Sequence, residues 1–230
     1  DQVFEQAKLA VVRTLERMSM GGIYDHLGGG FARYSVDARW LVPHFEKMLY
    51  DNAQLIDVLT LVWQGTRMPL YRERIAETAD WIVREMQTKD GGFAASFDAD
   101  SDGVEGKYYV WSETEIDAVL TPARSALFKQ VYDVTAQGNW EGANILNRLR
   151  AMNYLQPEQE ALLSGQRKQL LKARGERTRP LWDDKVLADW NGLAIAALVN
   201  AATVFQKPEW HLPAVKAFWF IAEKMTHGSQ

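Results

Sequence analysis

Apolar residues recur at three- and four-residue steps along most of this sequence, which is the period of amphipathic helices. Near the start of the chain this pattern runs from Val3 to Met18 and stops at Gly21-Gly22, where glycine readily ends a helix. Ser112 to Glu115 follows the pattern of a capping box and indicates the start of another helix. The pattern predicts helices at about 3–18, 45–63, 71–86, from 112 onward, 123–132, 157–174, 186–205 and 213–225.

Two connectors between these helices share one pattern. Phe31–Ser35 and Trp40–Val42 flank a turn at Asp37, and Phe93–Phe97 and Lys107–Trp111 flank an acidic turn that contains glycine. Both connectors are predicted to be short β-hairpins. The order of helix, Gly-Gly-Phe hairpin and helix returns after about 60 to 70 residues, which favours stacked helical pairs and an all-α fold.

The predicted helix from Val186 to Phe205 has apolar residues on every side, which is typical of a helix buried all round. Asp189 and Asn200 interrupt it and fall on one stripe of the helix surface. A buried polar stripe needs hydrogen-bond partners, so we expect other side chains or a ligand beside it.

Composition narrows the classes of function. The chain has 230 residues, a hydrophobic content of 47% and a net charge of -4, which suits one buried core and argues against a nucleic-acid surface. It has no cysteine, which excludes disulfides, zinc–thiolate sites and a cysteine nucleophile. The apolar run from Gly192 to Val199 is too short for a membrane span, and the first residues lack a signal-peptide pattern, so a cytoplasmic location is expected.

The segment from Gly28 to Asn52 is the richest in chemistry. It combines three glycines, five large aromatic residues, one histidine and three carboxylates at a predicted loop-to-helix junction. Such a combination is typical of the lining of a cleft for a polar ligand, and the alternative is an ordered structural loop with aromatic packing.

Several residues in and beyond this segment are candidates for chemistry. His44, Lys47 and Asp51 share one edge of the predicted helix, and the helix entrance favours a neutral His44 that acts as a base. Asn52 falls on the apolar face, where it either caps a neighbouring loop or faces a sugar hydroxyl. The predicted catalytic residues are His44, Glu46, Asp51 and Asp184, and the predicted substrate-binding residues are Tyr34, Trp40, Asn52, Asp98, Trp111, Asp189, Trp190 and Asn191.

No metal or cofactor is predicted. Asp98 to Gly103 imitates the first half of an EF-hand loop, but Tyr109 stands where the twelfth loop position requires a bidentate glutamate. The three glycines at 28–30 lack the lysine and hydroxyl residue of a phosphate-binding loop.

Four motifs in order along the chain resemble those of the YyaL-like, spermatogenesis-associated thioredoxin-domain family. They are Gly28–Asn52, Gly91–Trp111, Gly138–Leu146 and Asp183–Leu193. The resemblance implies a helical domain similar to the six-hairpin glycosidases and the N-acylglucosamine 2-epimerases, which is an (α/α)6 toroid. Residues 1–230 are then expected to form part of one such toroid, with a thioredoxin-like domain before it and the rest of the toroid after it.

Two classes of function follow. One is a carbohydrate-active enzyme, either a glycoside hydrolase, which needs two carboxyl groups, or a sugar epimerase, which needs bases such as His44. The other is a non-catalytic module that binds a ligand or protein for the attached thioredoxin-like domain. The expected partner is a sugar or another polar small molecule. An open toroid would also expose apolar side chains such as Leu198 and Phe218, which predicts self-association.

Overall fold

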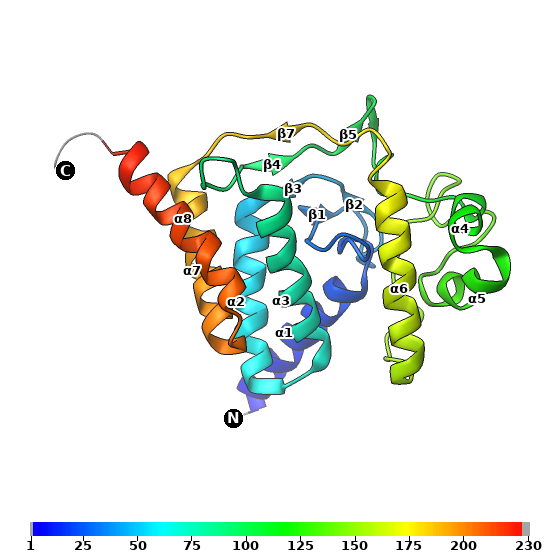
Figure 1. Ribbon diagram of the computed structural model, residues 1–230. Helices are drawn as coiled ribbons and strands as arrows, with labels where there is room; N and C mark the ends of the chain where they lie inside the picture. Colours follow the sequence, from blue (N-terminus) through cyan, green and yellow to red (C-terminus); the bar gives the residue numbers. More distant parts are fainter. Residues whose placement is uncertain (1, 227–230) are drawn as a thin grey trace. The chain divides into compact units, whose positions relative to one another are not determined.

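The computed structural model describes residues 2–226, and these form an all-α fold with short antiparallel strands, as predicted (Figure 1). A single π-helical segment, Ile82–Met86, continues the third helix. The helices are α1 (Gln2–Met20), α2 (Leu49–Thr66), α3 (Pro69–Trp81), α4 (Glu113–Leu120), α5 (Pro122–Val131), α6 (Pro157–Arg174), α7 (Ala188–Phe205) and α8 (Pro208–Lys224). The strands are β1 (Tyr34–Ser35), β2 (Pro43–His44), β3 (Lys47–Met48), β4 (Ser96–Phe97), β5 (Asp100–Ser101), β6 (Val104–Glu105) and β7 (Trp182–Asp183).

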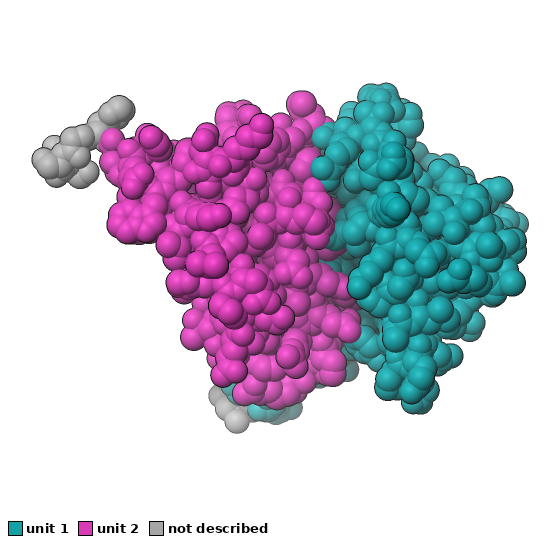
Figure 2. Space-filling view, in the orientation of Figure 1, with its two compact units in different colours: residues 1–28, 32–45, 99–180 teal, residues 29–31, 46–98, 181–230 magenta. Residues whose placement is uncertain are grey.

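The chain divides into two compact units, each built from several stretches of sequence (Figure 2). The first unit comprises residues 1–28, 32–45 and 99–180, and the second comprises residues 29–31, 46–98 and 181–230.

The first unit has its apolar core between α4, α5 and α6 (Figure 1). Trp111, Ile116, Phe128 and Leu163 are among the buried residues of this core. The predicted capping box is present: the Ser112 hydroxyl accepts from the Glu115 N–H at 3.2 Å, and the Glu115 carboxylate accepts from the Ser112 N–H at 2.7 Å. These bonds satisfy two of the backbone donors that a helix start leaves open.

Helix α1, also in the first unit, ends at Met20, directly before Gly21-Gly22, as the sequence predicts. Its buried residues are Leu15, Ser19 and Met20, whereas Val3 and Phe4 are exposed by 72% and 64%. The apolar stripe that predicted α1 is therefore buried only in its last turns.

The second unit consists of two antiparallel helical hairpins and a small sheet. Helix α2 packs against α3 and α7, and α7 packs against α8 (Figure 1). Strand β4 lies between β3 and β7, with Lys47 opposite Phe97 and Ser96 opposite Asp183. This sheet joins three connectors that are far apart in the sequence, and all of them lead into or out of the hairpins.

Several predicted details are wrong. The last helix begins at Pro208 rather than near Pro213. The helix expected from residue 45 begins at Leu49, because residues 43–48 form β2 and β3 instead. The second predicted hairpin does not pair 93–97 with 107–111: β4 pairs with β3 and β7, and the acidic turn is closed by β5 and β6. The first predicted hairpin is present, with Tyr34 opposite His44, but its second strand is Pro43–His44 rather than Trp40–Val42.

Helix α7 is buried on one face rather than all round. Asn191, Ala194 and Leu198 are buried, whereas Asp189 and Leu193 are exposed. Among the described residues, α7 is the helix whose length and apolar composition would suit a membrane span, but core helices meet the same criteria. Its buried face packs against α2 and α8, which accounts for its apolar character.

Candidate functional site

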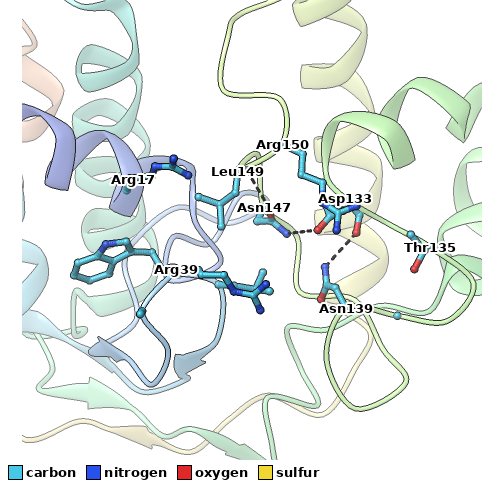
Figure 3. A pocket seen from close by; sticks show the side chains of 12 residues that line it. Arg17, Arg39, Asp133, Thr135, Asn139, Asn147, Leu149 and Arg150 are labelled. Carbon is cyan, nitrogen blue, oxygen red and sulfur yellow. Dashed lines mark hydrogen bonds and ion pairs between the residues drawn. The ribbon is translucent and has the colours of Figure 1, made fainter.

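The first unit contains a cavity of about 620 Å³ that is open to solvent (Figure 3). Its walls come from the end of α1, the loop between β1 and β2, and the long connection between α5 and α6. The lining residues are Arg17, Ala38, Arg39, Trp40, Leu41, Asp133, Thr135, Gly138, Asn139, Asn147, Leu149 and Arg150. Of the predicted site residues, Trp40 lies here.

Asp37 shapes the wall that carries Arg39 and Trp40. Its Oδ1 accepts from the Arg39 N–H at 2.9 Å and from the Leu41 N–H at 3.0 Å, and Trp40 adopts a left-handed backbone conformation with φ of 65°. Burial alone would raise the pKa of Asp37, but the hydrogen bonds from the Leu41 and Arg39 N–H groups outweigh burial and hold that pKa below its ordinary value. The ionised carboxylate therefore stabilises this loop.

A tight loop at residues 138–144 forms part of the opposite wall. Gly138 has φ of 78°, and a Cβ atom there would lie 2.4 Å from the Ala143 carbonyl oxygen, so only glycine fits. The Asn139 side chain accepts from the Ile145 N–H at 2.9 Å and donates to the Asp133 and Ile145 carbonyls. These bonds explain the glycine and asparagine of the motif at 138–146.

Among the described residues that line this cavity, one has a carboxylate side chain, Asp133. Asn147 Nδ2 donates to its Oδ2 at 3.3 Å, and the Arg150 guanidinium lies 3.3 Å from its Oδ1 (Figure 3). Asn147 also donates to the Ile145 carbonyl and accepts from the Leu149 N–H. The two lining amides thus serve the protein's own backbone, and the side chains left to meet a ligand are chiefly arginines and Trp40.

His44 pairs with Glu105 elsewhere in the first unit. Its Nδ1 lies 2.7 Å from Glu105 Oε1, and its ring stacks on Tyr34 at 5.0 Å between centroids. His44 belongs to β2, so the predicted helix-dipole effect on it is wrong, as is the helical edge shared with Lys47. Sequence reasoning missed Glu105 as the partner of His44 because 61 residues separate them.

Asn52 and Asn191, both predicted to bind substrate, are buried structural residues of the second unit. Asn52 Oδ1 accepts from the Phe31 N–H at 2.7 Å, and its Nδ2 donates to the Phe31 and Met48 carbonyls. Asn191 makes the same contacts with Phe93, at 2.7 and 2.9 Å. The loop-capping alternative therefore describes Asn52, and both amides bond to backbone groups, so a substrate-binding role for them stays a prediction.

Trp111 is also a packing residue rather than a substrate platform. Its exposed fraction is 2%, and the Arg177 guanidinium covers its ring at 3.9 Å from the centroid. Arg177 in turn donates to the Val110 carbonyl at 2.8 Å. A tryptophan enclosed in this way has no open face for a sugar ring.

The other candidates in the second unit lie at strand and helix ends. Asp98 follows β4 and Asp184 follows β7, and both are exposed, as is Asp189 in the first turn of α7. Trp190 packs edge-on against Tyr50 at 4.6 Å between centroids. Two further candidates are half-buried there, Glu46 ahead of β3 and Asp51 in the first turn of α2.

A common site for five of the candidates stays a prediction, because they belong to different units. Trp40 and His44 lie in the first unit, and Asp51, Asp184 and Trp190 lie in the second. Among the described residues, no group of three histidines or carboxylates is placed to hold a metal ion. Asp102, in the turn that imitates an EF-hand, instead pairs with Lys107 at 2.9 Å, and this hydrogen bond lowers the pKa of Asp102.

No protein-family model matches the chain. Two solved structures show a distant likeness. A D-mannose isomerase has a TM-score of 0.32 at 14% identity, over 92% of this chain and 50% of its own. A cellobiose 2-epimerase from Spirochaeta thermophila has a TM-score of 0.35 at 13% identity, over 97% of this chain and 55% of its own. Likenesses this weak do not bear on the chemistry of the present chain.

Sequence comparison gives much closer relatives. Spermatogenesis-associated protein 20 is 35% identical in Mus musculus over 88% of this chain, and 34% identical in Homo sapiens over 86%. An uncharacterized protein of Caenorhabditis elegans is 32% identical over 95% of this chain. The chain spans about a third of the length of these relatives, namely 30%, 29% and 35%. Over this shared region, the chain belongs to the family of the spermatogenesis-associated protein 20 sequences.

Proposed function

We propose that the first unit binds a hydroxylated small molecule of sugar size in the cavity beside Trp40. The observation that carries this proposal is the cavity itself, because its volume of about 620 Å³ lies in the range of small-molecule sites and its lining combines one indole with several polar side chains. An indole face suits the apolar face of a sugar ring, while the arginine side chains and the Thr135 hydroxyl around it can meet the hydroxyl groups.

The lining supports binding rather than hydrolysis. Glycoside hydrolysis requires two carboxyl groups across the scissile bond, one protonated and one ionised. Among the described residues that line the cavity, Asp133 is the one carboxylate, and Asn147 donates a hydrogen bond to it. A single carboxylate engaged in this way suits a ligand-binding module, which is the alternative to an enzyme in this family.

A second candidate is sugar epimerisation, and the pairing of His44 with Glu105 favours it. A carboxylate that accepts from Nδ1–H leaves the lone pair of a neutral imidazole on Nε2, as a general base requires. The base would remove the proton next to a sugar carbonyl, and protonation from the other face would give the epimer.

Tryptophan emission during titration with neutral and phosphorylated monosaccharides and disaccharides tests the binding proposal. We expect a saturable change that Trp40→Phe removes and that Trp219→Phe, on exposed α8 of the second unit, retains. Calorimetry on the same variants checks that the emission change reports binding. If no sugar binds, or if binding is the same in Trp40→Phe and in the unchanged protein, the proposal is wrong.

Hydrogen exchange tests the second candidate. Sugars incubated with the protein in D2O should gain deuterium next to the carbonyl, and His44→Gln should slow this exchange by roughly 100-fold or more. His211→Gln, a change at an exposed histidine of α8, is the matched control. Exchange at equal rates in the two variants would exclude His44 as the base.

A further inference from the structure

We propose that the ligand of this cavity carries an anionic group, a phosphate or a carboxylate, and that Arg17, Arg39 and Arg150 hold it. This inference rests on the proposed function, because it names the class of molecule that the same cavity takes. The three arginines come from α1, from the loop after β1 and from the connection before α6, and Figure 3 shows them around one cavity.

The charge of the lining is the first argument. Three arginines and one aspartate give the cavity a net charge of +2, whereas the chain as a whole carries -4. Cationic side chains gathered in a concave surface raise the local concentration of anions. A cavity for a neutral sugar has no need of this local excess of positive charge.

The hydrogen-bonding state of the neutral groups is the second argument. Asn139 and Asn147 direct their amides to backbone groups and to Asp133, so they offer little to a sugar hydroxyl. A site that selects neutral sugars would leave such amides and carboxylates open to the ligand. Apart from these amides, the donors of the lining are the three guanidinium groups, the Thr135 hydroxyl and the Trp40 indole N–H, and the guanidinium groups carry all the positive charge.

The weak engagement of the arginines is the third argument. Within the part of the chain that the structure describes, Arg17 has no ion-pair partner, and Arg39 reaches the Asp37 carboxylate only at 3.9 Å. Arg39 and Arg150 have side chains exposed by 76% and 78%, so the ion pair that Arg150 makes with Asp133 is weak as well. Guanidinium groups bind phosphate and carboxylate through paired, charge-assisted hydrogen bonds, so an anion would satisfy them better than water-exposed partners do.

Calorimetric titration with glucose, glucose 6-phosphate, glucuronate and inorganic phosphate tests the inference. We expect at least one of the two charged sugars to bind about tenfold more tightly than glucose, with an affinity that falls as salt is raised. Comparison of the phosphate with the carboxylate identifies which anion the arginines prefer.

Single substitutions assign the effect to the arginines. Arg17→Ala, Arg39→Ala and Arg150→Ala should each weaken the charged sugar severalfold and leave glucose almost unchanged. Arg13→Ala is the matched control, because it removes an exposed arginine one turn earlier on α1, outside the cavity lining. Thermal unfolding of each variant identifies any loss that comes from misfolding.

The outcomes separate the inference from the proposed function. Equal affinity for glucose and both charged sugars, or equal losses in Arg13→Ala and Arg17→Ala, overturns the inference and leaves the sugar cavity in place. Inorganic phosphate that binds as tightly as glucose 6-phosphate, with no binding of glucose, supports the anion site and overturns the sugar proposal. Absence of binding by all four molecules overturns both.

Discussion

The Asn52 side chain forms two hydrogen bonds with the backbone of Phe31. Its Oδ1 accepts from the Phe31 N–H at 2.7 Å, and its Nδ2 donates to the Phe31 carbonyl at 3.0 Å. Asn191 holds Phe93 in the same way, and each asparagine also donates to the carbonyl of its own helix cap, Met48 or Leu187. Each amide therefore satisfies both the N–H and the carbonyl of one loop residue, as a neighbouring strand does in a β-sheet. The repeated Gly-Gly-Phe segments are thus fixed by asparagines at the same position of two helices.

Replacement of Asn52 by alanine should lower the free energy of unfolding by about 1 to 3 kcal/mol or more, because it leaves the buried polar groups of Phe31 without partners. Gln54→Ala on the same helix is the control, since Gln54 is exposed and donates to the Tyr50 carbonyl of its own helix. Urea unfolding of the two variants measures the difference. Equal losses would show that the Asn52 amide has no special role.

A pair of glycines in the 138–144 loop separates steric from conformational effects. Gly138 and Gly142 have φ of 78° and 79°, but a Cβ at Gly138 meets the Ala143 carbonyl at 2.4 Å whereas one at Gly142 meets nothing within 4 Å. Gly142→Ala should therefore cost only the strain of the left-handed conformation, about 1 kcal/mol or somewhat more. Gly138→Ala should cost clearly more and reduce ligand binding in the cavity, as unfolding and titration can measure.

Helix positions were largely predictable from the sequence, and strand pairing was not. The sequence predicts a helix at 157–174 from a weaker apolar pattern, and these residues form α6, where Pro157 suits the first helical turn. Met48 continues the apolar period of α2, so the sequence predicts helix at Lys47 and Met48. They form a strand because β4, about 50 residues away, pairs with them, and no local pattern announces this pairing.

The cavity was only partly predictable. Trp40 was a candidate, but Arg39 and Arg150 look like solvated surface charges when they are read one at a time. The available signal was the motif at 138–146, where two glycines and two asparagines in one short loop indicate a backbone held in an unusual path. That signal identifies the wall of the cavity, whereas the arginines that complete it come from distant segments.

The stability of the first unit should depend on pH through Asp37. The folded-state pKa of this carboxyl lies below its ordinary value, so its ionised form stabilises the folded state at any pH above the unfolded pKa. As the pH falls from the unfolded pKa of Asp37 to its lower folded pKa, this contribution to stability decreases. Below the folded pKa the contribution is absent.

Asp37→Asn isolates this effect, because it keeps the Oδ1 acceptor for Arg39 and Leu41 and removes the charge. The variant should be less stable than the unchanged protein at neutral pH, and the difference should shrink as the solution is acidified below about pH 4. Thermal unfolding at a series of pH values measures the difference. Asp90→Asn, a change at an exposed carboxylate, should show no such trend. A difference that stays constant down to low pH would contradict the prediction.

A buried ion pair secures α6 to the loop that follows α1. Arg174 donates to both carboxylate oxygens of Asp25 at 2.8 Å, and the two side chains are exposed by 4% and 7%. Asp25→Asn should destabilise the protein by roughly 3 to 5 kcal/mol, because it leaves a buried guanidinium without its counter-charge. Glu209→Gln, which breaks the exposed pair with Lys207, should change the stability very little. Unfolding by denaturant compares the two, and similar costs would show that burial does not decide the value of this pair.

The outer face of α8 should drive self-association of this chain. Phe218 and Trp219 have exposed fractions of 53% and 55%, whereas Leu198, which was also predicted to be exposed, is fully buried. Adjacent exposed aromatic side chains lose unfavourable contact with water when they meet a second apolar surface.

Sedimentation velocity at increasing protein concentration should show a rising mass, and Phe218→Glu combined with Trp219→Glu should keep the chain monomeric. Val3→Glu with Phe4→Glu on the exposed part of α1 is the matched control, because it removes apolar surface of another helix. Association that persists in the α8 variant and is lost in the α1 variant would move the contact to α1, and a monomer at all concentrations would exclude self-association altogether.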